Sequence, residues 1–178
     1  GGLCTGALVR MFLIDPERRE DVRGFFTTTW CAREFEAHGL NPRLLQCSVS
    51  FNKRKGTLRG MHYQVAPLEE VKLVRCTMGA IHDVIIDLRP TSPSYRQSVA
   101  VVLTAENRRM LHVPEGCAHG FQTLAADTEV FYQMSEFYSP EHARGFRWDD
   151  PAFGIEWPEA VRTISDRDRS YADFAPEG

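Results

Sequence analysis

Apolar and polar residues alternate in short runs along most of the chain, as they do in half-buried β-strands. In residues 80–88, "AIHDVIIDL", Val84 and Ile86 fall on one face of the expected strand, and acidic residues occupy the other. Residues 71–77 form a second such run, and Gly79 separates the two. Two runs joined at a glycine predict a β-hairpin.

Other short runs, separated by turn residues, predict further strands and few helices. These strands are expected at residues 58–64, 98–104, 109–113 and 128–135. Before the last third of the chain, one helix is expected, over residues 30–39 with its end at Gly39. Many strands with a few short helices predict an all-β sandwich or barrel. Because no repeat or low-complexity linker interrupts the pattern, we expect residues 1–178 to form a single domain.

The composition is typical of a globular protein in a reducing compartment. Of the 178 residues, 43% are hydrophobic, and no apolar run reaches the roughly 18 residues that a membrane-spanning helix needs. A formal net charge of -3 argues against a general nucleic-acid binder. The opening residues lack the basic and apolar blocks of a signal peptide. The five cysteines are scattered, without a C-x-x-C pair, so we expect free thiols and a cytoplasmic location.

Seven side chains could take part in chemistry, and each also has a structural explanation. A histidine within a strand, such as His62, is commonly a hydrogen-bonded structural residue. Lys72 is equally compatible with an exposed strand position. Tyr132 shares the inward face of its strand with Val130 and Met134, where a buried tyrosine with a satisfied hydroxyl is expected. The seven candidates are His62, Lys72, His119, Tyr132, Tyr138, Asp166 and Asp168.

The segment "LRGMHYQ", residues 58–64, places Arg59 and His62 in one expected strand. Residues three positions apart face opposite sides of a regular strand. The two side chains can therefore share a site only if a bulge or a twist interrupts the strand.

Residues 113–121, "VPEGCAHGF", resemble the second motif of the cupin superfamily and raise the possibility of a metal site. The histidine of that motif, here His119, often binds a metal in cupins. The first cupin motif has two histidines flanking one residue and a downstream glutamate, whereas this chain has His62, Tyr63 and Gln64. At most two imidazoles remain, too few for a transition metal that takes three or four protein ligands. The resemblance therefore implies a cupin jelly roll, or double-stranded β-helix, with no bound metal.

Eight segments occur in a fixed order over nearly the whole chain. They are RGFF (23–26), GTLRGMHYQ (56–64), KLVRC (72–76), VIIDLRPTSPSY (84–95), LTAENRRML (103–111), VPEGCAHGF (113–121), EFYSPEHARGFRWDDPAFGIEWP (136–158) and ISDRDRS (164–170). Together they resemble the dTDP-4-dehydrorhamnose 3,5-epimerase family. The resemblance implies a homodimeric jelly-roll isomerase that acts on a nucleotide-linked 4-keto-6-deoxy sugar and needs no redox cofactor.

The chemistry of such a substrate explains the residues that match the family. A ketone at C4 makes the hydrogens on C3 and C5 acidic, because the carbanion delocalises onto oxygen as an enolate. Inversion then needs a base, an acid on the opposite face, and a cation or donor at the ketone oxygen. The resemblance assigns His62 as the base, with Asp168 as its paired carboxylate. It assigns Tyr132 as the proton donor and Lys72 as the cation near the enolate.

The same resemblance implies the residues that bind the substrate. Arg59 and Arg23 match contacts to the pyrophosphate, with Arg23 supplied by the partner subunit, and guanidinium forks suit phosphate oxygens. Phe26 and Tyr138 match residues that pack around the nucleobase. The remaining substrate contacts that the resemblance implies are Gln46, Ser48, His119 and Arg167.

Three departures from the family pattern fall near the nucleotide. Thr28 and Ala143 stand where the family commonly has glutamate, and Ser48 stands where asparagine is common. The catalytic set is complete. The sequence therefore predicts proton exchange beside a ketone, while inversion of one centre only and a CDP- or GDP-linked substrate remain open.

Two other functional classes also remain open. A non-catalytic cupin that binds a sugar nucleotide would not incorporate solvent deuterium into a 4-keto sugar. A metal-dependent cupin, such as a small-molecule oxygenase or isomerase, would contain a metal by elemental analysis.

Overall fold

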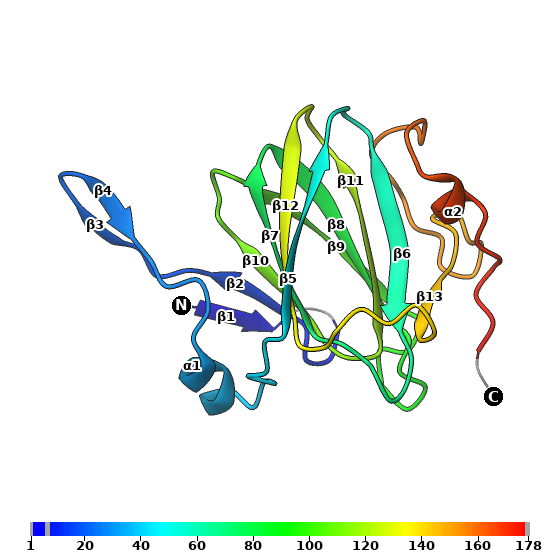
Figure 1. Ribbon diagram of the computed structural model, residues 1–178, viewed down its shortest axis with the longest axis horizontal. Coiled ribbons are helices and arrows are strands. Elements are labelled where there is room, and N and C mark those ends of the chain that lie inside the picture. The colour runs from blue at the N-terminus through cyan, green and yellow to red at the C-terminus, as the bar shows by residue number, and fades with distance from the viewer. Residues whose placement is uncertain (1, 6–7, 177–178) are drawn as a thin grey trace.

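The computed structural model describes residues 2–5 and 8–176, which form two packed β-sheets, a small projecting hairpin and two short helices (Figure 1). In this part of the chain, one sheet has the strand order β1-β2-β10-β7-β12-β5 and the other has the order β13-β6-β11-β8-β9. The first, six-stranded sheet contains β1 (Gly2–Thr5), β2 (Phe12–Asp15), β5 (Gln46–Asn52), β7 (Lys72–Met78), β10 (Met110–Val113) and β12 (Thr128–Met134). The second, five-stranded sheet contains β6 (Leu58–Gln64), β8 (Ala80–Asp87), β9 (Ser98–Thr104), β11 (Cys117–Thr123) and β13 (Ala143–Gly145).

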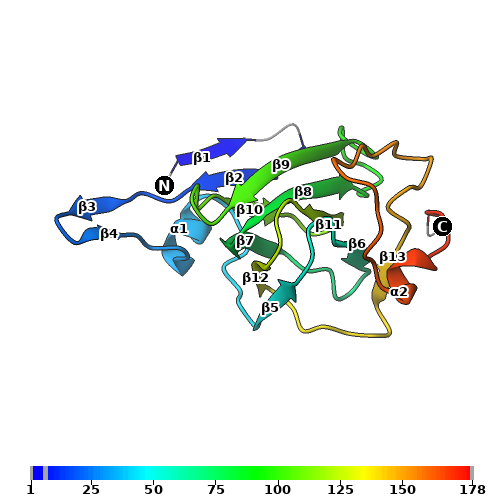
Figure 2. The same cartoon turned by 90° about the horizontal axis from the view of Figure 1, so that it is seen from above.

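The hairpin and the helices lie outside the two sheets. Strands β3 (Arg19–Asp21) and β4 (Gly24–Phe26) pair with each other and project away from the sheets, as Figures 1 and 2 both show. Helix α1 (Ala32–Ala37) follows this hairpin, and helix α2 (Asp166–Arg169) lies near the opposite end of the molecule beside β6. No helix in the described ranges is long and apolar enough to cross a bilayer.

The main core lies between the two sheets, where alternate residues of each strand point inward. Val74 and Val130 come from the six-stranded sheet, and Ile85 and Phe121 come from the five-stranded sheet; each is at most 1% exposed. Tyr132 packs against this cluster, as its inward position in the sequence pattern predicts.

Both sheets are also covered in part on their outer faces. On the six-stranded sheet, Phe35 of α1 packs with Leu73 and Met110. On the five-stranded sheet, Phe146 from the C-terminal segment packs with Val84 and Ile86. Strand β8 is therefore buried on both faces, with the face that carries Asp83 turned toward the space between the sheets.

The predicted all-β architecture with a few short helices is confirmed. Strands β6 and β9 match the predicted residues 58–64 and 98–104, and helix α1 lies within the predicted residues 30–39. Gly39 ends this helix with a φ of 69°, in the left-handed region that glycine adopts without strain. The prediction that residues 1–178 form a single domain stays a prediction.

The predicted hairpin around Gly79 is wrong. Strand β7 pairs with β10 and β12, whereas β8 pairs with β9 and β11 in the other sheet. At Gly79, whose φ is 78°, the chain crosses from one sheet to the other instead of folding back on itself. The alternating pattern indicates both strands correctly, but it carries no information about which strands pair.

Candidate active site

A cavity of about 290 Å³ opens between the ends of the two sheets. Lys72 and Tyr132 line it from the six-stranded sheet, and His62 lines it from β6 of the five-stranded sheet. The side chains around this cavity therefore come from two opposing walls. Of the residues that the resemblance singled out, the lining includes Gln46, Ser48, His62, Lys72, Tyr132, Tyr138 and Arg167.

His62 and Asp168 form a hydrogen-bonded pair at this cavity, with 2.6 Å between Nε2 and Oδ1. The second carboxylate oxygen of Asp168 accepts a hydrogen bond from the backbone N–H of Gly60, at 3.1 Å. Ser165 caps helix α2 by accepting from the backbone N–H of Asp168, at 3.1 Å. These contacts hold the carboxylate in one orientation, and the carboxylate in turn sets the orientation and tautomer of the imidazole.

The electrostatics of the pair favour an ionised carboxylate beside a neutral imidazole. Burial would raise the pKa of Asp168, but its hydrogen bonds with His62 and Gly60 and the nearby charges hold that pKa below the ordinary value. Burial lowers the pKa of His62, against the opposing effect of Asp168. With Nε2–H donating to the carboxylate, Nδ1 carries the lone pair and can act as a base near neutral pH.

A β-bulge brings Arg59 and His62 to the same face of β6. His119 of β11 lies opposite His62, and Phe121 lies opposite Arg59, so three steps along β6 match two steps along β11. The bulge contains Gly60, whose φ of 133° suits glycine and whose added Cβ would lie 2.6 Å from the Cα of Gly120. The bulge is the interruption that the spacing of Arg59 and His62 requires for a shared site.

Tyr132 faces the cavity from the wall opposite His62. Its hydroxyl lies 3.0 Å from the Oγ of Ser50. Burial raises the pKa of the Tyr132 hydroxyl above its ordinary value, so the phenol keeps its proton near neutral pH. The arrangement provides a proton donor across the cavity from a proton acceptor.

Lys72 is paired with Glu70, which the sequence reasoning missed. Nζ of Lys72 lies 3.3 Å from Oε1 of Glu70, and the two side chains are 13% and 12% exposed. Both residues line the cavity, so the ammonium group is oriented by a carboxylate that is also part of the wall. The spacing could have indicated Glu70, because residues two apart in an extended chain share a face.

The His119 ring packs against the Tyr132 ring, and His119 is absent from the cavity lining. Its Nε2 is 2.6 Å from Oδ1 of Asp83, both side chains are almost completely buried, and its ring meets the Tyr132 ring edge-on at 6.3 Å between centroids. The predicted contact of His119 with the ligand stays a prediction.

Several predicted binding residues form the rim of the cavity. The backbone N–H of Tyr138 donates to Oε1 of Gln46 at 3.1 Å, and Nη1 of Arg167 lies 3.4 Å from the Tyr138 hydroxyl. Arg59 is absent from the lining; its Nε donates to Oδ1 of Asn52 at 2.7 Å. Of the three departures from the family pattern, Ser48 and Ala143 lie on the cavity wall.

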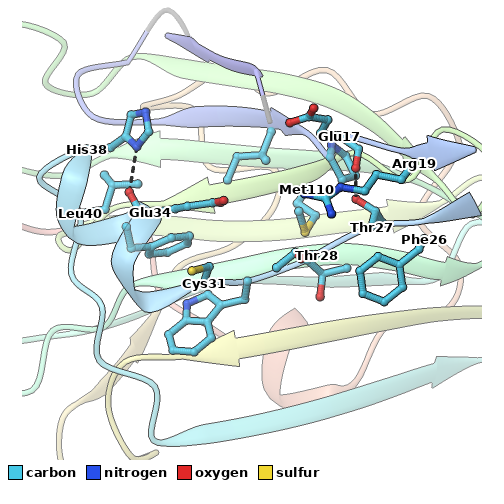
Figure 3. Close-up of a pocket in the computed structure, with 15 residues that line it drawn as sticks. Glu17, Arg19, Phe26, Thr27, Thr28, Cys31, Glu34, His38, Leu40 and Met110 are labelled. Atoms are coloured by element: carbon cyan, nitrogen blue, oxygen red, sulfur yellow. Dashed lines mark hydrogen bonds between the residues drawn. The ribbon is translucent and has the colours of Figure 1, made fainter.

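Arg23 and Phe26 are far from this cavity within one chain, because both belong to the projecting hairpin. Phe26 is 68% exposed. It lines a separate, smaller pocket between the base of the hairpin and α1, where Thr28 and Cys31 also lie (Figure 3). This pocket contains none of the predicted acid and base residues.

No group of three or more His, Cys, Asp or Glu side chains in the described ranges is arranged to hold a metal ion. In the pairs His62–Asp168 and His119–Asp83, Nε2 of the histidine is hydrogen-bonded to Oδ1 of the aspartate. The expectation of a metal-free site stays a prediction, which elemental analysis can test.

Comparisons with known proteins agree on one family. A sequence model described as dTDP-4-dehydrorhamnose 3,5-epimerase matches residues 6–176. The dTDP-4-dehydrorhamnose 3,5-epimerase of Sinorhizobium fredii is 42% identical over 165 residues, which cover 92% of this chain and 85% of the relative.

Two solved structures of enzymes from this family have the same fold. The epimerase of Bacillus anthracis, with TDP and pyrophosphate bound, has a TM-score of 0.93 at 38% identity and covers 97% of this chain and 99% of its own. The epimerase of Legionella pneumophila, in complex with dTDP-4-keto-L-rhamnose, has a TM-score of 0.89 at 33% identity and covers 97% and 92%. The family and the cupin-type fold predicted from the sequence are thus confirmed: the chain belongs to the dTDP-4-dehydrorhamnose 3,5-epimerase family.

Proposed function

We propose that the chain inverts C3 and C5 of dTDP-4-dehydro-6-deoxyglucose, giving dTDP-4-dehydrorhamnose, by proton removal and return through an enolate. One observation carries the proposal: the base candidate His62 and the acid candidate Tyr132 line one cavity from opposing sheets. An enolate is flat, so a base on one side and an acid on the other invert the carbon between them.

Each residue has a defined part in this mechanism. Nδ1 of His62 takes the proton from carbon, and Asp168 stabilises the imidazolium that forms. The ammonium group of Lys72 stabilises the negative charge that develops on the ketone oxygen. Tyr132 then donates its proton to the opposite face of the carbon. Proton transfer from carbon to His62 and from Tyr132 to carbon requires a neutral His62 and a protonated Tyr132. The pKa shifts of the two residues favour these forms.

The nucleotide contacts are proposed from the family resemblance. Arg59 lies on the same face of β6 as His62, and we assign it to the pyrophosphate. Tyr138 and Arg167 at the rim, together with Gln46 and Ser48 on the wall, are positioned to contact the rest of the ligand. His119 completes the proposed set. The bound TDP of the Bacillus anthracis relative and the bound sugar nucleotide of the Legionella pneumophila relative support a thymidine diphosphate carrier.

We further propose that the chain forms a homodimer in which Arg23 and Phe26 reach the cavity of the partner subunit. The hairpin that carries them projects from its own sheets (Figure 2). The outer face of β5, beyond the part of the sheet that α1 covers, exposes Val49 and Phe51 at 56% and 46%. Exposed apolar side chains gathered on a sheet face are typical of an interface. Sedimentation equilibrium tests the dimer, and Arg23→Ala tests the contribution of the hairpin.

The predicted cytoplasmic location is kept as part of the proposal. The four cysteines whose side chains are described, Cys31, Cys47, Cys76 and Cys117, are free thiols. Free thiols are typical of a reducing compartment. We propose no membrane or nucleic-acid partner.

The proposed activity is tested by incubating the purified protein with dTDP-4-dehydro-6-deoxyglucose and following the sugar protons by NMR. Inversion at both carbons gives dTDP-4-dehydrorhamnose, whereas inversion at C3 or C5 alone gives a different, single-centre epimer. Binding of the substrate without any change in its spectrum would instead indicate a non-catalytic binding protein.

A further inference from the structure

The aromatic ring of Tyr171 lies against the imidazole of His62. The ring centroids are 6.0 Å apart and the planes meet at 72°, an edge-to-face contact. Tyr171 follows helix α2, which carries Asp168, so the hydrogen-bond partner of His62 and this aromatic neighbour come from the same short segment.

Gly145 provides the space for this ring. Gly145 of β13 lies directly opposite His62 in the register of β13 and β6. A Cβ added to Gly145 would lie 2.3 Å from Cζ of Tyr171 and 2.4 Å from Cε2, closer than atoms can approach. Any side chain larger than glycine at this position would therefore displace the Tyr171 ring from its place beside His62.

The Tyr171 ring has a second neighbour, Arg167. The guanidinium carbon of Arg167 lies 5.9 Å from the ring centroid, within the range of a cation–π contact. The carbonyl of Tyr171 accepts a hydrogen bond of 3.5 Å from Nη1 of Arg147. Among the described residues, the buried hydroxyl of Tyr171 has no hydrogen-bond partner. The Arg167 guanidinium is still near enough to the hydroxyl to oppose the rise in the Tyr171 pKa that burial causes. The contact with His62 is made by the ring.

We propose that Tyr171 is a positioning residue for the base His62. Gly145 is required for this role, because only glycine leaves room for the Tyr171 ring. This inference rests on the proposed function for its effect on catalysis. The hydrogen bond to Asp168 holds one atom of the imidazole, and the Tyr171 ring blocks rotation of the imidazole about that bond. The ring also excludes water from one side of His62.

Four variants test the proposal: Tyr171→Ala, Tyr171→Phe, Gly145→Ala and the double variant Gly145→Ala/Tyr171→Ala. Two measurements are made on each, the kcat for epimerisation and the pKa of the His62 imidazole by NMR titration. The His62 signal is identified by its absence from His62→Asn. Loss of the ring should hydrate the imidazole, so its pKa should rise toward the ordinary value.

The expected pattern is specific to a positioning role. Tyr171→Ala and Gly145→Ala should each raise the pKa of His62 and lower kcat, by about tenfold for a base that loses its alignment. Tyr171→Phe keeps the ring and should match the wild type in both measurements. In the double variant, Gly145→Ala should add nothing to the effect of Tyr171→Ala, because the ring that it displaces is already absent.

Two results would overturn the proposal. One is an unchanged His62 pKa in Tyr171→Ala; the other is an independent loss from Gly145→Ala in the Tyr171→Ala background, which would indicate a general disturbance of β13. Failure of the proposed function would appear differently, as a wild-type protein without turnover. The NMR titration would still decide whether Tyr171 controls the environment of His62.

Discussion

Nε2 of His62 and Oδ1 of Asp168 lie 2.6 Å apart, although the two residues are 106 positions apart in the chain. The bulge in β6 turns His62 toward the cavity, and the capped helix α2 brings Asp168 to it from the C-terminal segment. The base of the proposed reaction is thus built from two distant parts of the sequence, and its protonation depends on both.

Asp168→Asn should lower kcat and also shift the pH dependence of kcat/KM. The Asp168 carboxylate raises the pKa of His62 against the effect of burial. Without that charge, the pKa of His62 should fall further below its ordinary value of about 6.5, and the acid limb of the profile should move to lower pH. Tyr171→Ala should move the same limb to higher pH. Profiles of the two variants that shift in the same direction would contradict this account of His62.

Tyr132→Phe should uncouple proton removal from inversion. The variant loses only the hydroxyl that lies 3.0 Å from Ser50, so the fold should persist and the enolate should still form. In D₂O, deuterium should enter the recovered substrate while little inverted product accumulates, which mass spectrometry and NMR can follow together. Normal epimer formation by this variant would assign the proton donor elsewhere, with Tyr138 as the next candidate.

Lys72→Met should lower kcat by about a hundredfold or more, because the enolate loses its cation. It should also lower the free energy of unfolding, by about 1–3 kcal/mol, because Glu70 is left largely buried without its partner.

The double variant Lys72→Met/Glu70→Gln separates these two effects. Removing the Glu70 charge should restore most of the stability, measured by urea denaturation, while the activity stays low. Recovery of activity in the double variant would show that Lys72 acts only by neutralising Glu70.

The departures from the family pattern predict a relaxed choice of nucleotide. A glutamate near the nucleobase can accept a hydrogen bond from a ring N–H. Thr28 lies with Phe26 in the pocket at the base of the hairpin, so in the proposed dimer it would approach the partner's nucleobase with only a short neutral hydroxyl. Calorimetric titration should give affinities for dTDP and at least one other nucleoside diphosphate within about tenfold, or roughly 1.4 kcal/mol.

Arg59→Ala is the companion test, because the pyrophosphate is common to all these ligands. It should weaken all of them together, by a few kcal/mol if the phosphate is left buried without its partner. A preference for dTDP of a hundredfold or more in the wild type would show that another residue replaces the missing glutamate.

Local patterns predicted the individual strands well and their arrangement poorly. Residues 58–64 form β6 as expected, because alternation and turn residues act over a few positions. The same patterns wrongly joined β7 and β8 into a hairpin, because strand pairing depends on contacts far along the chain. The sequence indicated only that a bulge or twist was needed for Arg59 and His62 to share a site. The position of the bulge depends on the close contact between Gly60 and Gly120 of another strand, which local patterns do not reveal.

The candidate site divides in the same way. His62 and Tyr132 could be named from strand patterns and the family resemblance, and Glu70 could have been named from its spacing to Lys72. The pairing of His62 with Asp168 came from the resemblance alone. No sequence pattern indicated Tyr171, because its contact with His62 depends on the absence of a side chain at Gly145.

Deuterium uptake from solvent tests the central claim, that His62 removes protons from the carbons beside the ketone, most directly. The wild type and His62→Asn are incubated in D₂O with dTDP-4-dehydro-6-deoxyglucose, and the sugar nucleotide is analysed by mass spectrometry. His38→Asn serves as a matched control, because His38 caps the C-terminal end of α1 and is absent from the cavity lining.

The wild type and His38→Asn should incorporate deuterium at C3 and C5, and His62→Asn should be slower by about a hundredfold to ten-thousandfold. Calorimetry should show unchanged dTDP affinity, since a role confined to the transition state lowers kcat and leaves binding intact. Exchange by His62→Asn at a tenth of the wild-type rate or faster would contradict the assignment of the base.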